Sequence, residues 1–231
     1  MTPDPAAKAG LGTPPPSTPE LPGAAPAWVD LHRGILACRR CQEAGYIPEA
    51  IPMYQGRPGQ RLMLIGQAPG IVELGPRKPF AGRSGAELAR WMVRAGFRDD
   101  DHFRALTYVT SVTKCFPGKS ASGSGDRRPS GAEVALCHPW LEAQLALVRP
   151  RLVLLVGGLA HAVFLPGRPL EALVGRLFDA PGVAAGPLLL PLPHPSGASR
   201  WLNDAGHRAL LDRALALLAE AWPPLAGPAN G

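Results

Sequence analysis

The amino-acid sequence predicts an α/β domain with three layers, α/β/α, around a central and mainly parallel sheet of four strands. Apolar runs of strand length alternate with helical patterns through most of the chain. One run, Leu152–Val156, is apolar throughout, as strands buried on both faces of a parallel sheet are. The 231 residues, 46% of them hydrophobic, are enough for one domain with a sizeable core.

The two ends of the chain differ from its middle in composition. Residues 1–27 contain eight prolines and almost no large apolar side chain. Such a segment cannot bury enough surface to offset the entropy lost on ordering, so we predict a disordered tail. Residues 223–231 have a similar composition and are predicted to be a flexible C-terminus. The folded domain is therefore expected to span residues 28–222.

Four segments are predicted to form the sheet: residues 61–66, 106–112, 152–156 and 188–190. In parallel α/β sheets, ligands bind beyond the carboxyl ends of the strands. We therefore expect the function to reside in the loops that begin at Gly66, Ser111, Gly157 and His194.

Capping-box spacing, a serine followed three residues later by a glutamate, predicts two helix starts. One helix is expected from Ser84 to residue 95, and a longer one from Ser130 to residue 148. The Gly/Ser-rich residues 117–129 precede the second and are predicted to form a loop. Helices over residues 159–165 and 203–222 complete the alternation.

The net charge of +6 is a modest basic bias, compatible with a polyanionic partner without identifying one. No apolar stretch approaches the roughly 20 residues of a membrane span. The N-terminus has neither the basic start nor the apolar run of a secretory signal. We therefore expect a cytoplasmic protein with no membrane partner.

The four cysteines need an explanation other than disulfides, because the cytoplasm is reducing. Cys38 and Cys41 form a C-x-x-C pair before the first strand, Cys115 follows the second strand, and Cys137 lies in the next helix. If the loop between the last two brings its ends together, four thiolates face one another. Four thiolates bind either structural zinc or an iron–sulfur cluster, and their spacing leaves both open.

Motifs at the predicted strand ends resemble those of a known family. Residues 66–70 read Gly-Gln-Ala-Pro-Gly, Glu73 follows, and Phe80 stands ten residues after the last of these glycines. Residues 108–115 read Tyr-Val-Thr-Ser-Val-Thr-Lys-Cys, and residues 194–196 read His-Pro-Ser. In this order the motifs are similar to those of the iron–sulfur uracil-DNA glycosylases, families 4 and 5. The family-4 loop reads G-E-x-P-G-x-x-E, and the second motif reads Y-I-T-N-V-V-K-C.

The resemblance covers roughly residues 28–218 and implies a monofunctional DNA-repair glycosylase. Such an enzyme extrudes uracil or another deaminated base from DNA and hydrolyses its N-glycosidic bond, leaving an abasic site. The partner implied is DNA that contains deaminated bases, and we expect a monomer. The resemblance also implies a 4Fe–4S cluster, with zinc as the alternative, on Cys38, Cys41, Cys115 and Cys137.

The resemblance assigns residues to the base pocket. Phe80 is expected to stack on the extruded base, and His194 to stabilise the negative charge that develops on the departing base. Backbone N–H groups of Gln67 and Ala68 are expected to bind the base from the opposite side, with Ser111 near the base edge.

Two positions depart from the family pattern. Gln67 replaces a glutamate, and an amide can orient water or hydrogen-bond a base but cannot accept a proton. Glu73 is therefore predicted as general base or charge stabiliser, which makes Gln67, Glu73 and His194 the catalytic set. Ser111 replaces an asparagine that reads the uracil edge, so hypoxanthine or xanthine is an alternative substrate.

Two groups of side chains are expected to contact DNA phosphates. One begins at the serine of the His-Pro-Ser motif and comprises Ser196, Ser199 and Arg200. The other surrounds the Gly/Ser-rich loop and comprises Lys114, Lys119, Arg127 and Arg128.

Two other functions stay open. A catalytically weak DNA- or lesion-binding protein of the same fold would explain Gln67 and Ser111. Alternatively, His194 or His138 attacks the sugar and traps a covalent adduct, as in some relatives. Their characteristic basic insert ending in histidine is not evident in residues 118–128.

Overall fold

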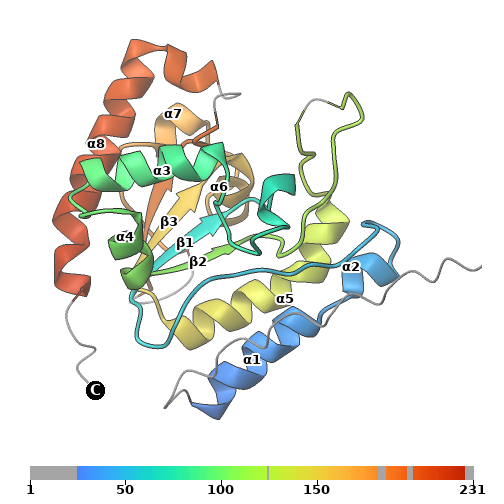
Figure 1. Ribbon diagram of the computed structural model, residues 1–231. Coiled ribbons are helices and arrows are strands. Elements are labelled where there is room, and N and C mark those ends of the chain that lie inside the picture. Colours follow the sequence, from blue (N-terminus) through green and yellow to red (C-terminus); the bar gives the residue numbers. More distant parts are fainter. Residues whose placement is uncertain (1–24, 124, 182–185, 197–199, 227–231) are drawn as a thin grey trace, which may run out of the picture.

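The computed structural model describes residues 25–123, 125–181, 186–196 and 200–226 (Figure 1). Within these residues the sheet contains five strands: β1 (Leu62–Gly66), β2 (Thr107–Ser111), β3 (Leu152–Val156), β4 (Phe178–Asp179) and β5 (Leu188–Leu192). Their order is β2-β1-β3-β5-β4. The four longer strands pair in parallel, and β4 pairs antiparallel with β5. The predicted three-layer fold is confirmed, with one additional edge strand that is too short to show a sequence pattern.

The helices are α1 (Pro26–Ala37), α2 (Arg40–Glu43), α3 (Arg83–Arg94), α4 (Asp100–Leu106), α5 (Gly131–Val148), α6 (Gly158–Phe164), α7 (Leu170–Leu173) and α8 (Ala205–Ala221). Three short 3-10 helices are η1 (Ile71–Glu73), η2 (Arg200–Asn203) and η3 (Pro223–Leu225). In the described part of the chain, none of the helices combines the length and apolar character that a membrane span requires.

Two apolar clusters cover the two faces of the sheet, because successive strand side chains point to opposite sides. Leu62 and Leu64 of β1 pack with residues of α3 and α8. Met63 and Ile65 pack with residues of α1, α5 and α6. Figure 1 shows α3 and α8 on one side of the sheet and α1 and α5 on the other. The sheet thereby becomes a rigid base for the loops at its carboxyl edge.

One of the two predicted capping boxes is present. The Ser130 hydroxyl accepts the Glu133 N–H at 3.3 Å, and the Glu133 carboxylate accepts the Ser130 N–H at 2.8 Å. Helix α3, however, begins at Arg83, so Ser84 lies inside it and its predicted capping role is wrong. The extended backbone of Gly82 takes the N-cap position, and its carbonyl accepts the Ala86 N–H at 3.1 Å.

The first helix starts earlier than predicted. Helix α1 begins at Pro26, inside the segment predicted to be the tail, and the Trp28 side chain is buried. The 3-10 helix η3 likewise lies within the predicted flexible C-terminus. Residues 1–24 and 227–231 lie outside the described residues, so the proposed domain limits are a prediction.

Candidate functional site

The loops after β1, β2 and β5 surround one cavity of about 470 Å³. All the residues predicted to bind the base or act in catalysis line it, together with two of the predicted phosphate contacts: Gln67, Ala68, Glu73, Phe80, Ser111, His194, Ser196 and Arg127. The loops are joined at their base, because the carbonyls of Gly66 and Gln67 accept the N–H groups of Val112 and Thr113 at 2.9 and 3.2 Å. The sheet edge therefore brings together residues that are 129 positions apart in the sequence.

Phe80 presents its ring to the cavity from an unusual backbone conformation. Its φ is +56°, in the left-handed region that residues other than glycine seldom adopt. Two glycines make room for it. A Cβ on Gly66 would lie 2.9 Å from the Phe80 ring, and a Cβ on Gly85 would lie 1.7 Å from the Phe80 carbonyl oxygen. Tertiary contacts therefore hold the Phe80 ring at the wall of the cavity.

Glu73 is half-buried at the end of η1. Its carboxylate accepts the Gly70 N–H at 3.3 Å and also hydrogen-bonds the Phe80 backbone. Burial raises the pKa of Glu73 to about 7. The two backbone hydrogen bonds lower that pKa and Asp126 raises it. A carboxyl that titrates near neutral pH in a cavity suits proton transfer, as predicted for Glu73.

His194 follows β5 and has a defined tautomer. The Ser196 N–H donates to Nδ1 at 3.2 Å, and the Ser196 hydroxyl lies 2.9 Å from the same atom. A backbone N–H can only donate, so Nδ1 is the acceptor and the neutral ring carries its proton on Nε2. Burial lowers the pKa of His194, which favours this neutral form. Gly157, at φ +87°, packs closely against the ring, since a Cβ there would lie 3.0 Å from Cδ2.

Ser111 lies at the end of β2 and is buried. Its hydroxyl donates to the Thr113 carbonyl at 2.7 Å. The hydroxyl proton is thus used within the protein, and the oxygen lone pairs are the groups left for a ligand. Ser111 is therefore an acceptor at the cavity wall, whereas an asparagine would offer both a donor and an acceptor.

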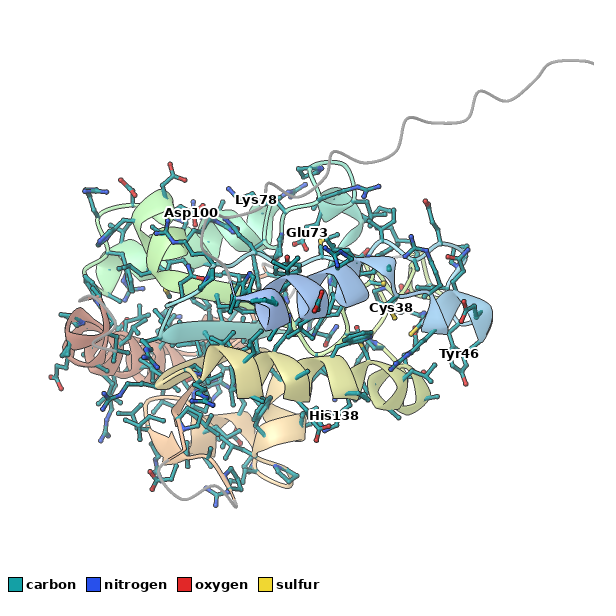
Figure 2. All side chains as sticks on the ribbon, turned by 90° about the horizontal axis from the view of Figure 1, so that it is seen from below. Cys38, Tyr46, Glu73, Lys78, Asp100 and His138 are labelled. Atoms are coloured by element: carbon teal, nitrogen blue, oxygen red, sulfur yellow. The ribbon has the colours of Figure 1, made fainter. Side chains whose placement is uncertain are left out.

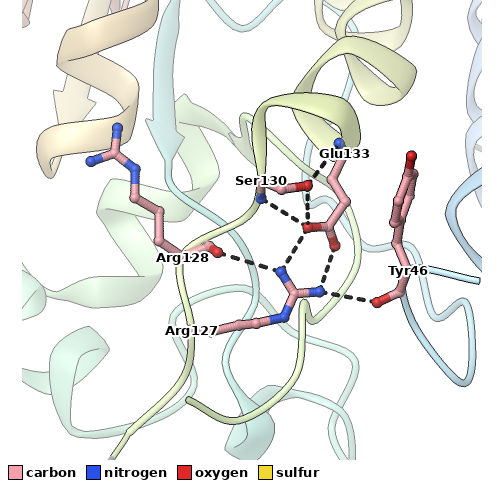
Figure 3. Close-up of polar contacts among 5 residues, drawn as sticks. All are labelled: Tyr46, Arg127, Arg128, Ser130 and Glu133. Atoms are coloured by element: carbon pink, nitrogen blue, oxygen red, sulfur yellow. Dashed lines mark hydrogen bonds and ion pairs between the residues drawn. The ribbon is translucent and has the colours of Figure 1, made fainter. Parts of the chain in front are cut away.

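The Gly/Ser-rich loop forms a further wall that the sequence did not predict. Asp126 and Arg127 line the cavity. Asp126 accepts the Ile71 N–H at 3.2 Å. Arg127 donates to both Glu133 carboxylate oxygens, at 2.7 and 2.8 Å, and to the Tyr46 carbonyl at 3.0 Å (Figure 3). The loop is therefore tied to η1 on one side, and to α5 and the segment after α2 on the other.

The predicted phosphate-binding patch around this loop needs correction. Lys119 pairs with Asp126 at 2.9 Å and Arg127 pairs with Glu133, so both charges are compensated within the protein. Lys114 is only 2% exposed, and its ammonium donates to the Ser111 carbonyl. A buried ammonium cannot reach a phosphate, so the prediction for Lys114 is wrong. Arg128, on the same loop, is exposed, and its phosphate contact stays a prediction.

The other predicted phosphate contacts follow His194. Ser196 lines the cavity, and Arg200 is exposed at the start of η2. Ser199 lies outside the described residues. His138 is half-buried on α5, pairs with Glu142 at 3.3 Å and is absent from the described lining of the cavity (Figure 2). Its position gives no support to a role for His138 as a nucleophile.

The four cysteines line a second cavity, between the α1–α2 junction, the segment after β2, and α5. Sulfur atoms gather around the labelled Cys38 in Figure 2. The Trp140 Nε1–H donates to Cys38 Sγ at 3.3 Å, and the Lys114 backbone N–H donates to Cys137 Sγ at 3.3 Å. Such N–H···S bonds favour thiolates over thiols, as expected around a metal centre.

Burial raises the pKa of Cys41 to about 11 and that of Cys115 to about 12, and the neighbouring thiols add to both shifts. These thiols therefore stay protonated by themselves, and a bound cation would favour their thiolate forms by compensating the charges. Among the described residues, no three or more His, Cys, Asp or Glu side chains are arranged as ligands of one metal ion. Four soft sulfur donors around one cavity nevertheless fit the donor set of a cluster.

Comparisons with known proteins identify the family of the chain. The family model described as the uracil DNA glycosylase superfamily matches residues 53–225. A type-4 uracil-DNA glycosylase of Pyrobaculum aerophilum is 30% identical over 156 residues, which are 68% of this chain and 70% of that protein. A type-4 enzyme of Thermotoga maritima is 28% identical over 160 residues, 68% of this chain and 76% of that protein. A type-5 enzyme of Mycobacterium leprae is 30% identical over 210 residues, 76% of this chain and 88% of that protein. The resemblance seen in the motifs is confirmed, and the chain belongs to the uracil DNA glycosylase superfamily.

Proposed function

We propose that this protein is a DNA glycosylase that excises uracil from DNA by hydrolysis and leaves an abasic site. The observation that carries the proposal is the convergence of an aromatic ring, a neutral imidazole and a carboxyl group with a pKa near 7 in one cavity. Relatives of both types that resemble this chain are named uracil-DNA glycosylases, which supports the assignment.

The cavity offers a partner for each part of an extruded uracil. The Phe80 ring provides a stacking surface, which DNA-repair glycosylases use to hold a flipped base. The Nε2–H of His194 can donate to a base oxygen and stabilise the anion that forms as the glycosidic bond breaks. The Ser111 oxygen can accept the ring N–H of uracil, because its own proton is donated to Thr113. The backbone of Gln67 and Ala68 completes the binding set.

Glu73 and Gln67 divide the handling of water in this proposal. The Gln67 amide orients the water, and the Glu73 carboxylate accepts its proton or stabilises the positive charge on the sugar. Phosphates next to the extruded nucleotide are contacted by Ser196, Ser199 and Arg200. We further propose that the protein works as a cytoplasmic monomer with a domain over residues 28–222.

Cleavage of defined oligonucleotides tests the function. Purified protein is incubated with strands that carry one uracil, hypoxanthine or xanthine, and alkali then breaks the DNA at any abasic site. We expect breaks at uracil, and expect His194→Asn to lower the rate by roughly 10²- to 10³-fold, as for loss of one oxyanion donor. Breaks only at hypoxanthine or xanthine would identify that base, and not uracil, as the substrate. Binding without breaks would support a lesion-binding protein, and a denaturant-resistant band shift would indicate a covalent adduct.

We also propose that Cys38, Cys41, Cys115 and Cys137 hold a 4Fe–4S cluster. When bound, the cluster supplies a structural cross-link between α1, the segment after β2, and α5, and hydrolysis needs no electron transfer. The expected result is a brown protein with about four iron atoms per chain, as a 4Fe–4S cluster requires, and loss of iron in Cys137→Ser. Colourless protein loaded with zinc would contradict this assignment while leaving the glycosylase proposal intact.

A further inference from the structure

Arg104 is a buried cation that contacts the backbone of the Phe80 loop. It lies on α4, and its side chain is only 6% exposed. Its Nε donates to Asp100 at 2.6 Å and its Nη1 donates to the Gln55 side chain at 2.7 Å. The guanidinium also donates to two consecutive carbonyls, that of Pro79 at 3.1 Å and that of Phe80 at 3.3 Å. One planar group thus reaches both peptide units that set the conformation of this turn.

The opposite side of the same turn is held by Glu73. The Phe80 backbone hydrogen-bonds the Glu73 carboxyl group, while its carbonyl is bound by Arg104. The carbonyl also packs directly on Gly85, where no Cβ would fit. Together these contacts stabilise a backbone conformation at φ +56° that a phenylalanine would otherwise avoid. The ring is thereby aimed at Gly66 and the cavity.

The contacts require an arginine. A guanidinium presents several N–H donors in a fixed plane, whereas a lysine ammonium is a compact point charge on a flexible stem. Lysine at position 104 can keep the ion pair with Asp100, but it cannot donate simultaneously to Gln55 and to the two carbonyls. The charge alone is therefore insufficient to hold the turn.

We propose that Arg104 is a positioning residue for base stacking, which acts by fixing the Pro79–Phe80 peptides so that the Phe80 ring forms one wall of the base cavity. The inference rests on the proposed glycosylase function for its catalytic consequence, and on the contacts alone for its structural one. Small misplacement of a group that orients the substrate is enough to reduce a rate by up to about 10²-fold.

The experiment compares Arg104→Lys and Arg104→Met with the matched control Arg57→Met. Arg57 donates to the Ala105 carbonyl of the same helix at 2.7 Å, but it is exposed and lies outside the contacts described for the Phe80 turn. Single-turnover excision of uracil, affinity for the uracil-containing duplex, and amide hydrogen exchange over residues 76–85 are measured for each protein. Circular dichroism establishes that each variant is folded.

We expect Arg104→Lys to lower the single-turnover rate by roughly 10- to 100-fold with little change in duplex affinity, and Arg57→Met to leave both unchanged. Exchange over residues 76–85 should be faster in both Arg104 variants than in the wild type and the control. In a Phe80→Ala background, Arg104→Lys should cause no further loss of rate, because the ring it positions is already gone.

Separate outcomes overturn the two proposals. Exchange at the wild-type rate in a folded Arg104→Lys protein would sink the positioning role, whatever the enzyme excises. Additive rate losses in the double variant would do the same, since they would indicate general destabilisation. A wild-type protein that excises none of the bases would refute the glycosylase function, while the exchange measurement would still decide whether Arg104 holds the turn. If Arg104→Met does not fold, the lysine variant carries the test because it keeps the charge next to Asp100.

Discussion

Arg127 and Glu133 form a two-pronged ion pair that joins the loop over the base cavity to the first turn of helix α5. The two N–O distances are 2.7 and 2.8 Å, and the Glu133 side chain is 4% exposed (Figure 3). Glu133 also completes the capping box of α5 and lines the cysteine cavity, while Arg127 lines the base cavity. One ion pair therefore connects the walls of the two cavities.

Glu133→Gln should destabilise the protein, because the Arg127 guanidinium loses its charged partner. The free energy of unfolding should fall by about 2 kcal/mol. The value takes into account that the Arg127 side chain is 30% exposed and can be solvated by water. Burial alone would raise the pKa of Glu133, but the bonds from Arg127 and Ser130 leave it lowered. The contribution of Glu133 is therefore present above the unfolded pKa of 4.5 and is lost as the pH falls through the lower folded value.

Urea unfolding at two pH values measures this prediction. The matched control is Glu142→Gln, because Glu142 lies on the same helix, pairs with His138 and has a side chain that is 65% exposed. Glu142→Gln should change the free energy of unfolding by no more than about 0.5 kcal/mol. Equal effects of the two substitutions would contradict a special role for the Arg127 pair.

Gly157→Ala should reduce excision more than its effect on stability explains. The backbone at Gly157 has φ +87°, and the added Cβ would lie 3.0 Å from the His194 ring. Displacement of that ring moves the donor that faces the base. Gly59→Ala is the matched control, because Gly59 has φ +85° with nothing within 4 Å of an added Cβ.

Backbone strain should lower the free energy of unfolding of both glycine variants by about 1 kcal/mol or more, as measured by urea unfolding. Only Gly157→Ala should also lower the single-turnover rate of excision. A similar loss of rate in both would indicate that strain, and not the His194 contact, is responsible.

The rate of excision should rise with pH through about 7, because burial raises the pKa of Glu73 to about 7 and its charged form is the active one. His194 should not contribute to this limb, since burial lowers its pKa and it stays neutral. Single-turnover rates between about pH 5 and about pH 9 measure the profile. Glu73→Gln should abolish the limb.

The stability effect of Glu73 has the opposite sign to that of Glu133. Its folded pKa of about 7 lies above the unfolded value of 4.5, so its favourable contribution is present at low pH and is lost as the pH rises through about 7. Glu73→Gln should therefore be more stable relative to the wild type at about pH 8 than at about pH 5. If Glu73→Gln leaves the pH profile of the excision rate unchanged, Glu73 is excluded as the group that titrates in catalysis.

Ser111→Asn should raise the preference for uracil over hypoxanthine. Ser111 offers the cavity an acceptor, because its hydroxyl proton is donated to Thr113. An asparagine adds a donor beside the acceptor and reaches further into the cavity. The ratio of the two single-turnover excision rates measures the change, with Ser111→Ala as the variant that removes the acceptor and adds no donor. An unchanged ratio in Ser111→Asn would place base selection elsewhere in the cavity.

The location of the base cavity could be predicted because its loops begin at strand ends. A buried apolar run such as Leu62–Gly66 identifies a strand, and parallel strands place their carboxyl ends at one edge. The resemblance of the motifs to those of the family predicted Phe80, Glu73 and His194 as parts of one site, and the three residues line one cavity.

The positively charged residues were harder to predict, because a sequence does not reveal their partners. Lys114 was expected at the surface but lies in the interior with its ammonium on the Ser111 carbonyl. Arg104 carries no motif, and its bond to Gln55 spans 49 positions. The charge pattern of a chain indicates electrostatic potential only when it is known which charges the fold pairs and buries.

The sequence by itself determined the four parallel strands, the loops at their carboxyl ends and the motif residues of the base cavity, because periodicity and motif spacing are local properties. Tertiary structure alone decided the left-handed conformation of Phe80, the tautomer of His194 and the pairing of Arg127 with Glu133. The Phe80 conformation depends on Arg104, 24 positions away, whereas the other two join residues only two and six positions apart that the loop conformations bring within hydrogen-bonding distance. The Gly66 and His194 loops are thus encoded in the sequence, whereas their exact shape is set by packing.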